Sequence, residues 1–198
     1  MPSEQKLRAE EWSVEPVPYA WAKRMVEAHH YAKGMSNTAI YCHGLFDDLG
    51  DLRGVAVWLC PTQRACLTVD PEWKKVISLS RLSIEPKAPK NAGTFLISRS
   101  VDLIRRDGRF RSLVSFADTA QGHTGRLYRA AGWTCMGMTV PTPLWVHPET
   151  GKMQAIKATK TLTVAEMRAR GWIFKGRFPK YKFVRYLDKR LHKQFCEL

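Results

Sequence analysis

The centre of the chain alternates strand-like and helix-like segments, and this order restricts the fold more than any other feature of the sequence. The apolar run VISLSRLSIEP (76–86) predicts a strand, and AGTFLISRSVDLIRRDG (92–108) predicts an amphipathic helix that ends at Gly108. The run RSLVSFAD (111–118) predicts a second strand, and GRLYRAAGW (125–133) a short helix. Such an order needs a sheet covered by helices, so we expect a mixed α/β layer.

Further elements are predicted on both sides of this centre. Before it, VPYAWAKRMVEAHHYAKG (17–34) predicts a helix closed by Gly34, and the strands NTAIYCHGLF (37–46) and LRGVAVWLC (52–60) form a hairpin through the polar turn DDLGD. After it, we expect a strand at TCMGMTV (134–140), a short helix at VAEMRARGW (164–172) and a C-terminal strand at 182–187. A chain of 198 residues fits one domain with an appendage: a core over 1–151 and a basic, aromatic-rich extension over 152–198 that packs on it.

Positive charge is concentrated in this extension. The whole chain has a net charge of +14, and residues 152–198 hold 13 Lys and Arg against three acidic residues, a net of +10. Such a segment attracts polyanions, which makes nucleic acid the leading partner and a solvated cationic face the alternative. The aromatic residues between the charges stack on bases, pack on the core, or do both. The predicted DNA contacts are Lys175, Arg177, Lys180, Tyr181, Lys182 and Arg185.

The cysteines and the apolar segments indicate the cellular compartment. The five cysteines are scattered and form no CxxC pair, which favours reduced thiols and gives no reason to expect a bound metal. The N-terminus has no apolar signal region, and no stretch is long enough to span a membrane. We therefore expect a cytoplasmic protein without a membrane partner; the oligomeric state is not predicted.

The stretch SFADTAQGHTGRLYRAAGW (115–133) gathers chemically capable residues around one strand-to-helix turn. Asp118 ends the strand, His123 lies in the glycine-rich loop, and Tyr128 lies in the helix. An acid and a tyrosine so placed can move protons at a bound substrate. The alternative interpretation is structural: Asp118 caps a helix and Tyr128 packs in the core. His123 is expected to shape the turn.

The segment from Val76 to Met138 resembles the core of the GNAT acyltransferase superfamily. The resemblance implies a mixed, mainly antiparallel sheet with a splayed central strand pair, helices on both faces and a basic C-terminal extension. In such a fold acyl-CoA lies between the splayed strands, and Tyr128 takes the place of a tyrosine that often protonates the departing thiolate. The implied cofactor contacts are Leu82, Ser83 and Ile84 for pantetheine, and the turn Lys90, Asn91, Ala92, Gly93 and Thr94 for the pyrophosphate. This turn lacks the family's leading Arg or Gln. Acetyl-CoA is thus the implied donor, with another donor, such as an aminoacyl-RNA, or a redox metal as alternatives.

Longer motifs resemble a narrower family, the Mom family of phage DNA-modification proteins. They are HHYAKG (29–34), SLSRLSIEPKAPKN (78–91), SFADTAQGHTGRLYRAAGW and the tail PKYKFVRYLD (179–188). The resemblance implies that a carbamoylmethyl group is added to the N6 of adenine in duplex DNA, inside a bacterial host, which hides restriction sites. The target base would have to leave the helical stack.

The same resemblance suggests roles for five residues. Asp118 is the acid or base for the adenine amine, and Tyr128 is a general acid or a ligand of the donor. His30 and Tyr31 contact the flipped base or the donor, and Arg81 is a charge clamp. Two other functions stay open: an ordinary N-acetyltransferase of a protein or small amine, and a non-catalytic DNA-binding protein on a decayed acyltransferase fold.

Overall fold

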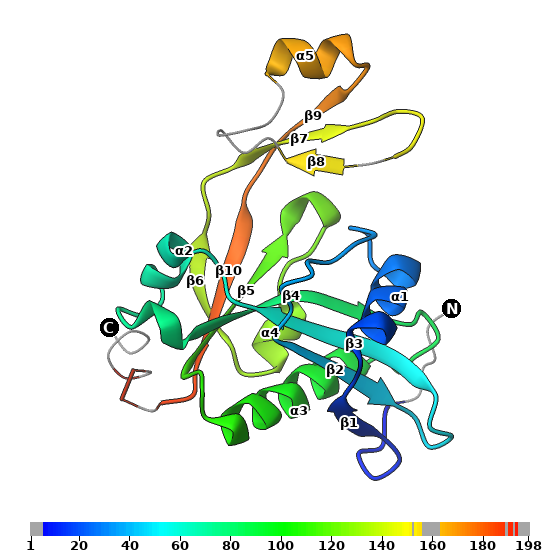
Figure 1. Cartoon of the computed structure of the whole chain (residues 1–198), viewed down its shortest axis with the longest axis vertical. Coiled ribbons are helices and arrows are strands. Elements are labelled where there is room, and N and C mark those ends of the chain that lie inside the picture. The colour runs from blue at the N-terminus through cyan, green and yellow to red at the C-terminus, as the bar shows by residue number, and fades with distance from the viewer. Residues whose placement is uncertain (1–5, 152, 156–162, 189, 192, 194–198) are drawn as a thin grey trace.

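The computed structural model describes residues 6–151, 153–155, 163–188, 190, 191 and 193. Its main layer is a seven-stranded sheet in the order β1-β2-β3-β4-β5-β10-β6 (Figure 1). The strands are β1 (Ser13–Pro16), β2 (Tyr41–Phe46), β3 (Leu52–Leu59), β4 (Val76–Ile84), β5 (Ser112–Asp118), β6 (Thr134–Met138) and β10 (Lys180–Tyr186). The helices of this part are α1 (Tyr19–His29), α2 (Gln63–Leu67), α3 (Ala92–Asp107) and α4 (Arg126–Ala130), with 3₁₀ turns η1 (Trp73–Lys75) and η2 (Thr119–Gln121).

The two central strands separate halfway along their length. Residues Val76–Leu79 of β4 pair in parallel with Ser112–Ser115 of β5, and the two strands do not pair beyond these residues. Every other pairing in the sheet is antiparallel. Beyond this point β4 stays paired with β3 up to Ile84, and β5 stays paired with β10 up to Asp118. The predicted mixed, mainly antiparallel sheet with a splayed central pair is confirmed.

Helices cover both faces of the sheet, as predicted. α3 buries Leu96, Ile97, Val101 and Ile104 against one face, where they meet side chains such as Trp58. Each fully buried aliphatic side chain contributes about 1.5–3 kcal/mol. α3 ends at Gly108, whose φ of 75° is left-handed, as the sequence predicted.

The opposite face carries α1, whose Ala22 and Val26 pack on Val55 and Val57 of β3. The predicted end of this helix at Gly34 is wrong. The chain leaves the helix at His30, whose backbone is extended, because the His30 ring accepts a hydrogen bond from the Ala32 N–H and closes a local turn instead.

Residues 140–179, which we call the arm, form a separate small unit. A three-stranded sheet, β8-β7-β9, contains β7 (Thr142–Val146), β8 (Met153–Ala155) and β9 (Ile173–Phe178), and it is covered by α5 (Val164–Ala169). Figure 1 shows the arm standing beyond the main sheet along the long axis of the molecule. Trp145 and Met167 are buried within it, so the arm has a small core of its own.

The arm changes the expected division of the chain. The boundary expected between residues 151 and 152 falls inside the small sheet, between β7 and β8. β10, expected as part of an appended extension, lies within the main sheet between β5 and β6. Its alternate residues point to opposite faces, so Phe183 joins the core beside α3 and Val184 joins the core beside α2.

Two further observations concern the described residues as a whole. None of their helices has the length and apolar character that a membrane span requires. Cys42, Cys60, Cys66 and Cys135 are free thiols, whereas Cys196 lies outside the described residues.

Candidate active site

A cleft of about 400 Å³ lies where β4 and β5 separate. One wall comes from the segment that follows α1, and the other from the loop between β5 and α4. Side chains that line it include His30, Tyr31, Leu82, His123, Arg126 and Tyr128. The splayed strands therefore bring together residues from distant parts of the sequence.

Asp118 ends β5 next to Ala117, which lines the cleft, but Asp118 is not itself a lining residue, and it makes two interactions. Its Oδ1 accepts a hydrogen bond from the Ala120 N–H at 3.1 Å, which caps η2. Its Oδ2 lies 2.6 Å from the Nζ atom of Lys180, and the carboxylate is 15% exposed. The capping role, which was the structural alternative, is present. The second oxygen accepts a charge-assisted hydrogen bond from Lys180, which fixes the orientation of the carboxylate.

Tyr128 is held in an aromatic setting at the base of the cleft. Its ring stacks on Phe183 at 5.0 Å and meets the edge of Trp133 at 5.7 Å. Its hydroxyl lies 2.8 Å from the Ser115 hydroxyl, which also bonds the Leu79 carbonyl oxygen at 3.0 Å. Burial raises the pKa of Tyr128, so the phenol keeps its proton at neutral pH.

His30 and Tyr31 form a stacked pair at the mouth of the cleft, with ring centroids 4.4 Å apart. Burial, followed by the positive charge of Arg81, lowers the pKa of His30 to about 4, so the imidazole is neutral at pH 7. Tyr31 is 42% exposed and meets the edge of His123 at 5.8 Å. Burial and the nearby negative charge of Asp118 raise the pKa of Tyr31.

Arg81 supports the cleft from outside. Its Nε donates to the Gly34 carbonyl oxygen at 2.8 Å, and one terminal nitrogen donates to the Ser80 carbonyl oxygen. The guanidinium thus fixes the segment that carries His30 and Tyr31, and it does not line the cleft. Two of its donors are engaged by the protein itself, which suits a positioning role.

The residues predicted to hold a coenzyme divide into two groups. Leu82 lines the cleft, whereas Ser83 faces α1, where its hydroxyl donates to the Met25 carbonyl oxygen, and Ile84 packs beside the core under α3. The predicted phosphate turn, Lys90 to Thr94, contributes no residue to the cleft lining.

The phosphate turn does not fit a pyrophosphate that enters from the cleft. Asn91 uses its side-chain oxygen to accept the Leu7 N–H at 2.7 Å. Leu127 of α4 packs so closely on Gly93 that a Cβ atom at Gly93 would lie 2.6 Å from the Leu127 Cδ1 atom. The absence of a side chain at Gly93 therefore serves the contact between α3 and α4, and Leu127 stands between the cleft and the phosphate turn.

The predicted DNA contacts also separate into two groups. Lys175 and Arg177 are exposed on β9 of the arm. The others lie on β10 inside the main sheet: Lys180 pairs with Asp118, Tyr181 packs beside the core, Lys182 donates to Thr68, and Arg185 donates to the Ala131 carbonyl oxygen. Burial lowers the pKa values of Lys182 and Arg185.

Three residues at the site were not predicted to act there. His123 and Arg126 line the cleft from the glycine-rich loop, and Ser115 bonds Tyr128. Ser115 interrupts the apolar run of β5, which is the one signal in the sequence that could have indicated it. Within the described part of the chain, no three His, Cys, Asp or Glu side chains are placed to hold a metal ion.

A splayed β4–β5 pair, a helix after β4 and a cleft between the strands define the GNAT acyltransferase fold. A spermidine N-acetyltransferase from Vibrio cholerae, solved with CoA and spermine, matches 92% of this chain and 99% of its own with a TM-score of 0.54 and 10% identity. A putative acetyltransferase, yncA, from Salmonella typhimurium, solved with acetyl-CoA, matches 89% of this chain and 94% of its own with a TM-score of 0.54 and 13% identity.

Within that fold, the chain belongs to the Mom protein family, which it matches over residues 11–197. A relative, methylcarbamoylase mom of Escherichia phage Mu, is 25% identical over 197 residues, which cover 94% of this chain and 80% of the relative. The resemblance seen in the sequence motifs is thus confirmed across most of the chain.

Proposed function

We propose that this protein is a transferase that adds a carbamoylmethyl group to the N6 amine of adenine in duplex DNA. Membership in the Mom family and the name of its phage Mu relative, a methylcarbamoylase, support the type of group. The observation that carries the proposal is a cleft lined by Tyr31 and Tyr128, with Asp118 next to its lining residue Ala117 and close enough to act electrostatically on Tyr31. The site of action is the DNA of a bacterial cytoplasm, where the modification shields restriction sites.

Asp118 is the proposed proton acceptor. The adenine amine is conjugated with the ring and is a weak nucleophile, so it must lose a proton as the new N–C bond forms. Lys180 and the Ala120 N–H each bond one oxygen of Asp118, which leaves a fixed carboxylate beside the cleft. A carboxylate held in this way costs no reorganisation when the reaction begins.

Tyr128 is the proposed proton donor to the leaving group. Its phenol keeps its proton at neutral pH, and Ser115 fixes the position of the hydroxyl oxygen. Asp118 would remove a proton from the amine and Tyr128 would deliver one to the group that leaves the donor. With acetyl-CoA these two transfers alone would give an N6-acetyl amide, so the carbamoylmethyl product also needs a source of the amide nitrogen and a bond from the amine to a methylene carbon.

His30 and Tyr31 are the proposed contacts for the base. An adenine amine inside a duplex is out of reach of any side chain, so the base must leave the stack at a cost of a few kcal/mol. The exposed Tyr31 ring at the mouth of the cleft offers a stacking surface, and the neutral His30 supports it from behind.

The donor is proposed by class alone. Acyl-CoA is the donor that the fold implies, and Leu82 and the free edge of β4 suit its acyl-bearing end. The closed phosphate turn does not suit its nucleotide end. A donor of another kind, such as an aminoacyl-RNA, therefore stays an alternative, and no step is assigned to the coenzyme.

Nucleoside mass spectrometry of DNA from bacteria that express the protein tests this proposal whatever the chemical class of the donor. We expect a carbamoylmethyl-adenine nucleoside with the unchanged chain, none with Asp118→Asn, and a normal amount with Asp48→Asn, an exposed aspartate remote from the cleft. Unmodified adenine together with acetylated protein or polyamine would replace the proposal with an ordinary N-acetyltransferase.

A further inference from the structure

The arm is an insertion at the tip of a hairpin. β6 and β10 pair antiparallel, and the chain enters the arm after Thr139 and returns from it at Lys180. These two residues are still bonded to each other, since the Thr139 N–H donates to the Lys180 carbonyl oxygen at 2.9 Å. A two-residue turn would be enough to connect the strands, but the chain inserts about 40 residues, whose described parts (140–151, 153–155 and 163–179) form a small sheet and a helix.

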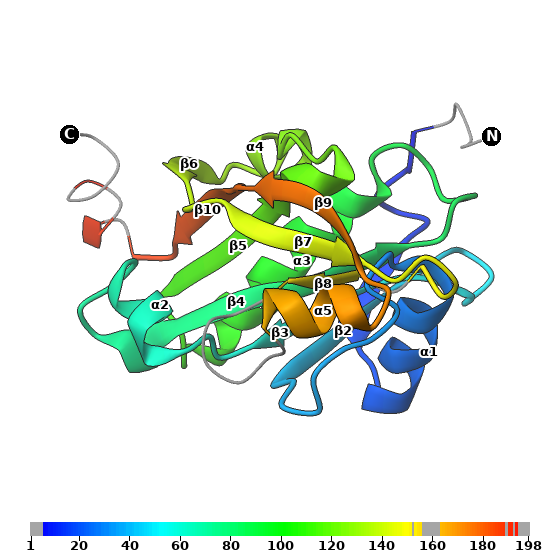
Figure 2. The same cartoon turned by 90° about the horizontal axis from the view of Figure 1, so that it is seen from above.

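The base of the arm shares a wall with the cleft. The Thr119 hydroxyl donates to the Pro179 carbonyl oxygen at 2.6 Å, and the Gln121 amide lies 3.2 Å from the Met153 sulfur on β8. Thr119 and Gln121 form η2, which leads directly into the residues that line the cleft. In the view from above, the strands of the arm and α5 lie in front of the main sheet (Figure 2).

The arm presents positive charge beside exposed apolar side chains. In the sequence, residues 140–179 hold seven Lys and Arg against two Glu. One of these, Glu166, is engaged in a capping box with Thr163 at the start of α5. On β9, the exposed Ile173 and Phe174 adjoin the exposed Lys175 and Arg177, at a bulge where Gly176 has a φ of 123°. Phe174 rests on Trp145 with ring centroids 5.3 Å apart, which leaves 47% of it exposed.

We infer that the arm is a clamp for double-stranded DNA, which Lys175 and Arg177 hold by its phosphates while Ile173 and Phe174 contact the groove. The inference rests on the proposed function for the identity of the polyanion. Two observations favour duplex DNA as the occupant: the sign of the charge on the arm, and the attachment of the arm to the cleft wall. Lys180, Lys182 and Arg185 of β10 bond other groups of the main domain. Among the basic residues predicted to contact DNA, Lys175 and Arg177 of the arm are the exposed ones.

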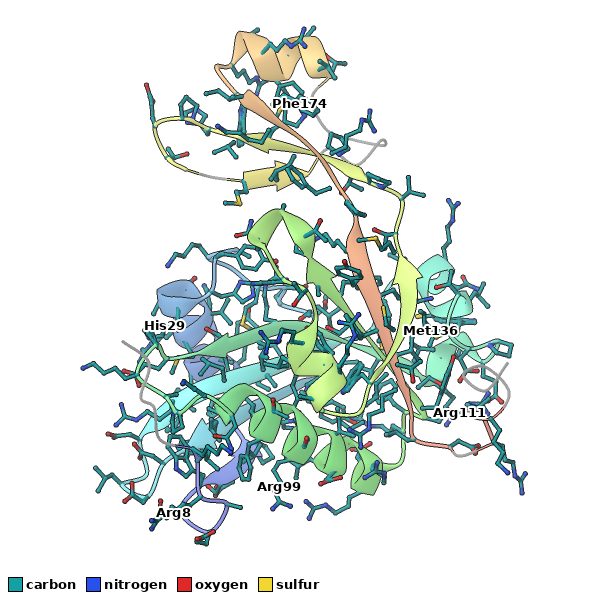
Figure 3. All side chains as sticks on the ribbon, turned by 180° about the vertical axis from the view of Figure 1, so that it is seen from behind. Arg8, His29, Arg99, Arg111, Met136 and Phe174 are labelled. Carbon is teal, nitrogen blue, oxygen red and sulfur yellow. The ribbon has the colours of Figure 1, made fainter. Side chains whose placement is uncertain are left out.

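The experiment compares two double variants of the full chain that remove equal charge. Lys175→Gln/Arg177→Gln changes the arm, and Arg99→Gln/Arg106→Gln changes the exposed face of α3, at the far end of the molecule from Phe174 (Figure 3). Binding to a fluorescent duplex is measured by anisotropy at several salt concentrations, with a thermal melt of each protein. The same cells that supply the proteins supply DNA for nucleoside analysis.

We expect the arm variant to bind the duplex at least tenfold more weakly at about 0.1 M salt. The slope of the logarithm of its binding constant against the logarithm of the salt concentration should be about 1 to 2 units less steep. We expect the α3 variant to stay within about twofold of the unchanged protein. Equal binding and equal DNA modification by the two variants would overturn the clamp while leaving the proposed function in place. Loss of duplex binding by the arm variant, with no modified adenine even in the unchanged protein, would support the clamp and refute the proposed function.

Discussion

The Nζ atom of Lys180 lies 2.6 Å from the Asp118 carboxylate, and the two residues are also direct partners in the β5–β10 pairing. The proposed proton acceptor, Asp118, is thus held by a residue of β10, 62 residues further along the chain. Lys180 was expected to contact DNA, and its place in the structure suits the control of Asp118 better.

The first prediction concerns this pair. Lys180→Gln is expected to lower DNA modification at least tenfold, because Asp118 loses the charged partner that orients its carboxylate. The salt dependence of duplex binding should stay unchanged. The double variant Asp118→Asn/Lys180→Gln should modify DNA no less than Asp118→Asn alone, because the effects of mutating two residues that act together do not add. Lys182→Gln is the matched control, and an equal loss of modification in it would argue against the pairing.

The second prediction separates chemistry from packing at the base of the cleft. Tyr128→Phe keeps the stack on Phe183 and loses the hydroxyl bonded to Ser115, at a cost in stability of about 1 kcal/mol. We expect a folded protein that no longer modifies DNA. Thermal melting and nucleoside mass spectrometry check the two parts, and Tyr181→Phe serves as the control. Normal modification by Tyr128→Phe would remove the phenol from the reaction.

The third prediction concerns stability in acid. His43 is buried, its Nδ1 lies 2.5 Å from the Ser100 hydroxyl, and the Trp58 N–H donates to the same oxygen at 2.7 Å. Burial lowers the pKa of His43 to about 4, against 6.5 for an ordinary histidine. Between these values the unfolded chain binds a proton that the folded chain does not, so stability is complete above pH 6.5 and falls as the pH drops toward 4.

The loss attributable to His43 is at most about 3 kcal/mol. Urea unfolding at pH 7, 5.5 and 4.5 measures it, and His43→Gln should flatten the pH dependence whatever its effect at pH 7. The exposed His29→Gln should leave the dependence intact. An unchanged slope in His43→Gln would mean that other groups govern the acid transition.

The fourth prediction concerns the closed phosphate turn. Because Leu127 fills the space beside Gly93, free CoA at about 1 mM should not raise the melting temperature, and Lys90→Gln should leave DNA modification unchanged. Leu127→Ala should admit more of the coenzyme than the unchanged chain does. A saturable stabilisation by CoA that disappears in Lys90→Gln would restore the phosphate turn as a coenzyme site.

The fifth prediction uses two glycines of the same loop. Gly122 and Gly125 both have left-handed backbones, with φ of 69° and 76°. A Cβ at Gly122 would meet open space, whereas one at Gly125 would overlap the Phe183 ring. Gly122→Ala should therefore cost about 1 kcal/mol of strain, and Gly125→Ala about 3 kcal/mol or more. Chemical unfolding measures both, and equal costs would show that the Phe183 ring moves away freely.

The sequence predicted the parts of the fold that local periodicity controls. The run from Val76 to Trp133 was recognisable because its strands and helices carry strong apolar patterns, and Gly108 ended α3 as expected. The strands of the arm were missed because their patterns are weak: β7 contains Pro143, and β9 has a bulge at Gly176. Neither strand shows the alternation that a half-buried sheet imposes.

The site was predictable residue by residue and not as an arrangement. The sequence indicated four of the site residues because they lie in motifs that occur in the same order as in the Mom family: His30, Tyr31, Asp118 and Tyr128. The link from Lys180 to Asp118 depends on the register of two strands far apart in the sequence, and the contact of Leu127 with Gly93 depends on how α3 meets α4. Such relationships exist only after the core has packed, so no short stretch of sequence contains them.

The position of β10 also bears on when the protein becomes competent during synthesis. The ribosome delivers β5, the cleft loop and α4 first, then the arm, and only afterwards the strand that carries Lys180 and Phe183. Until that strand emerges, Asp118 has no cation and Tyr128 has no ring beneath it. A nascent chain that has emerged only as far as the arm therefore lacks the strand that finishes the cleft, so the site is completed only after the arm has been synthesised.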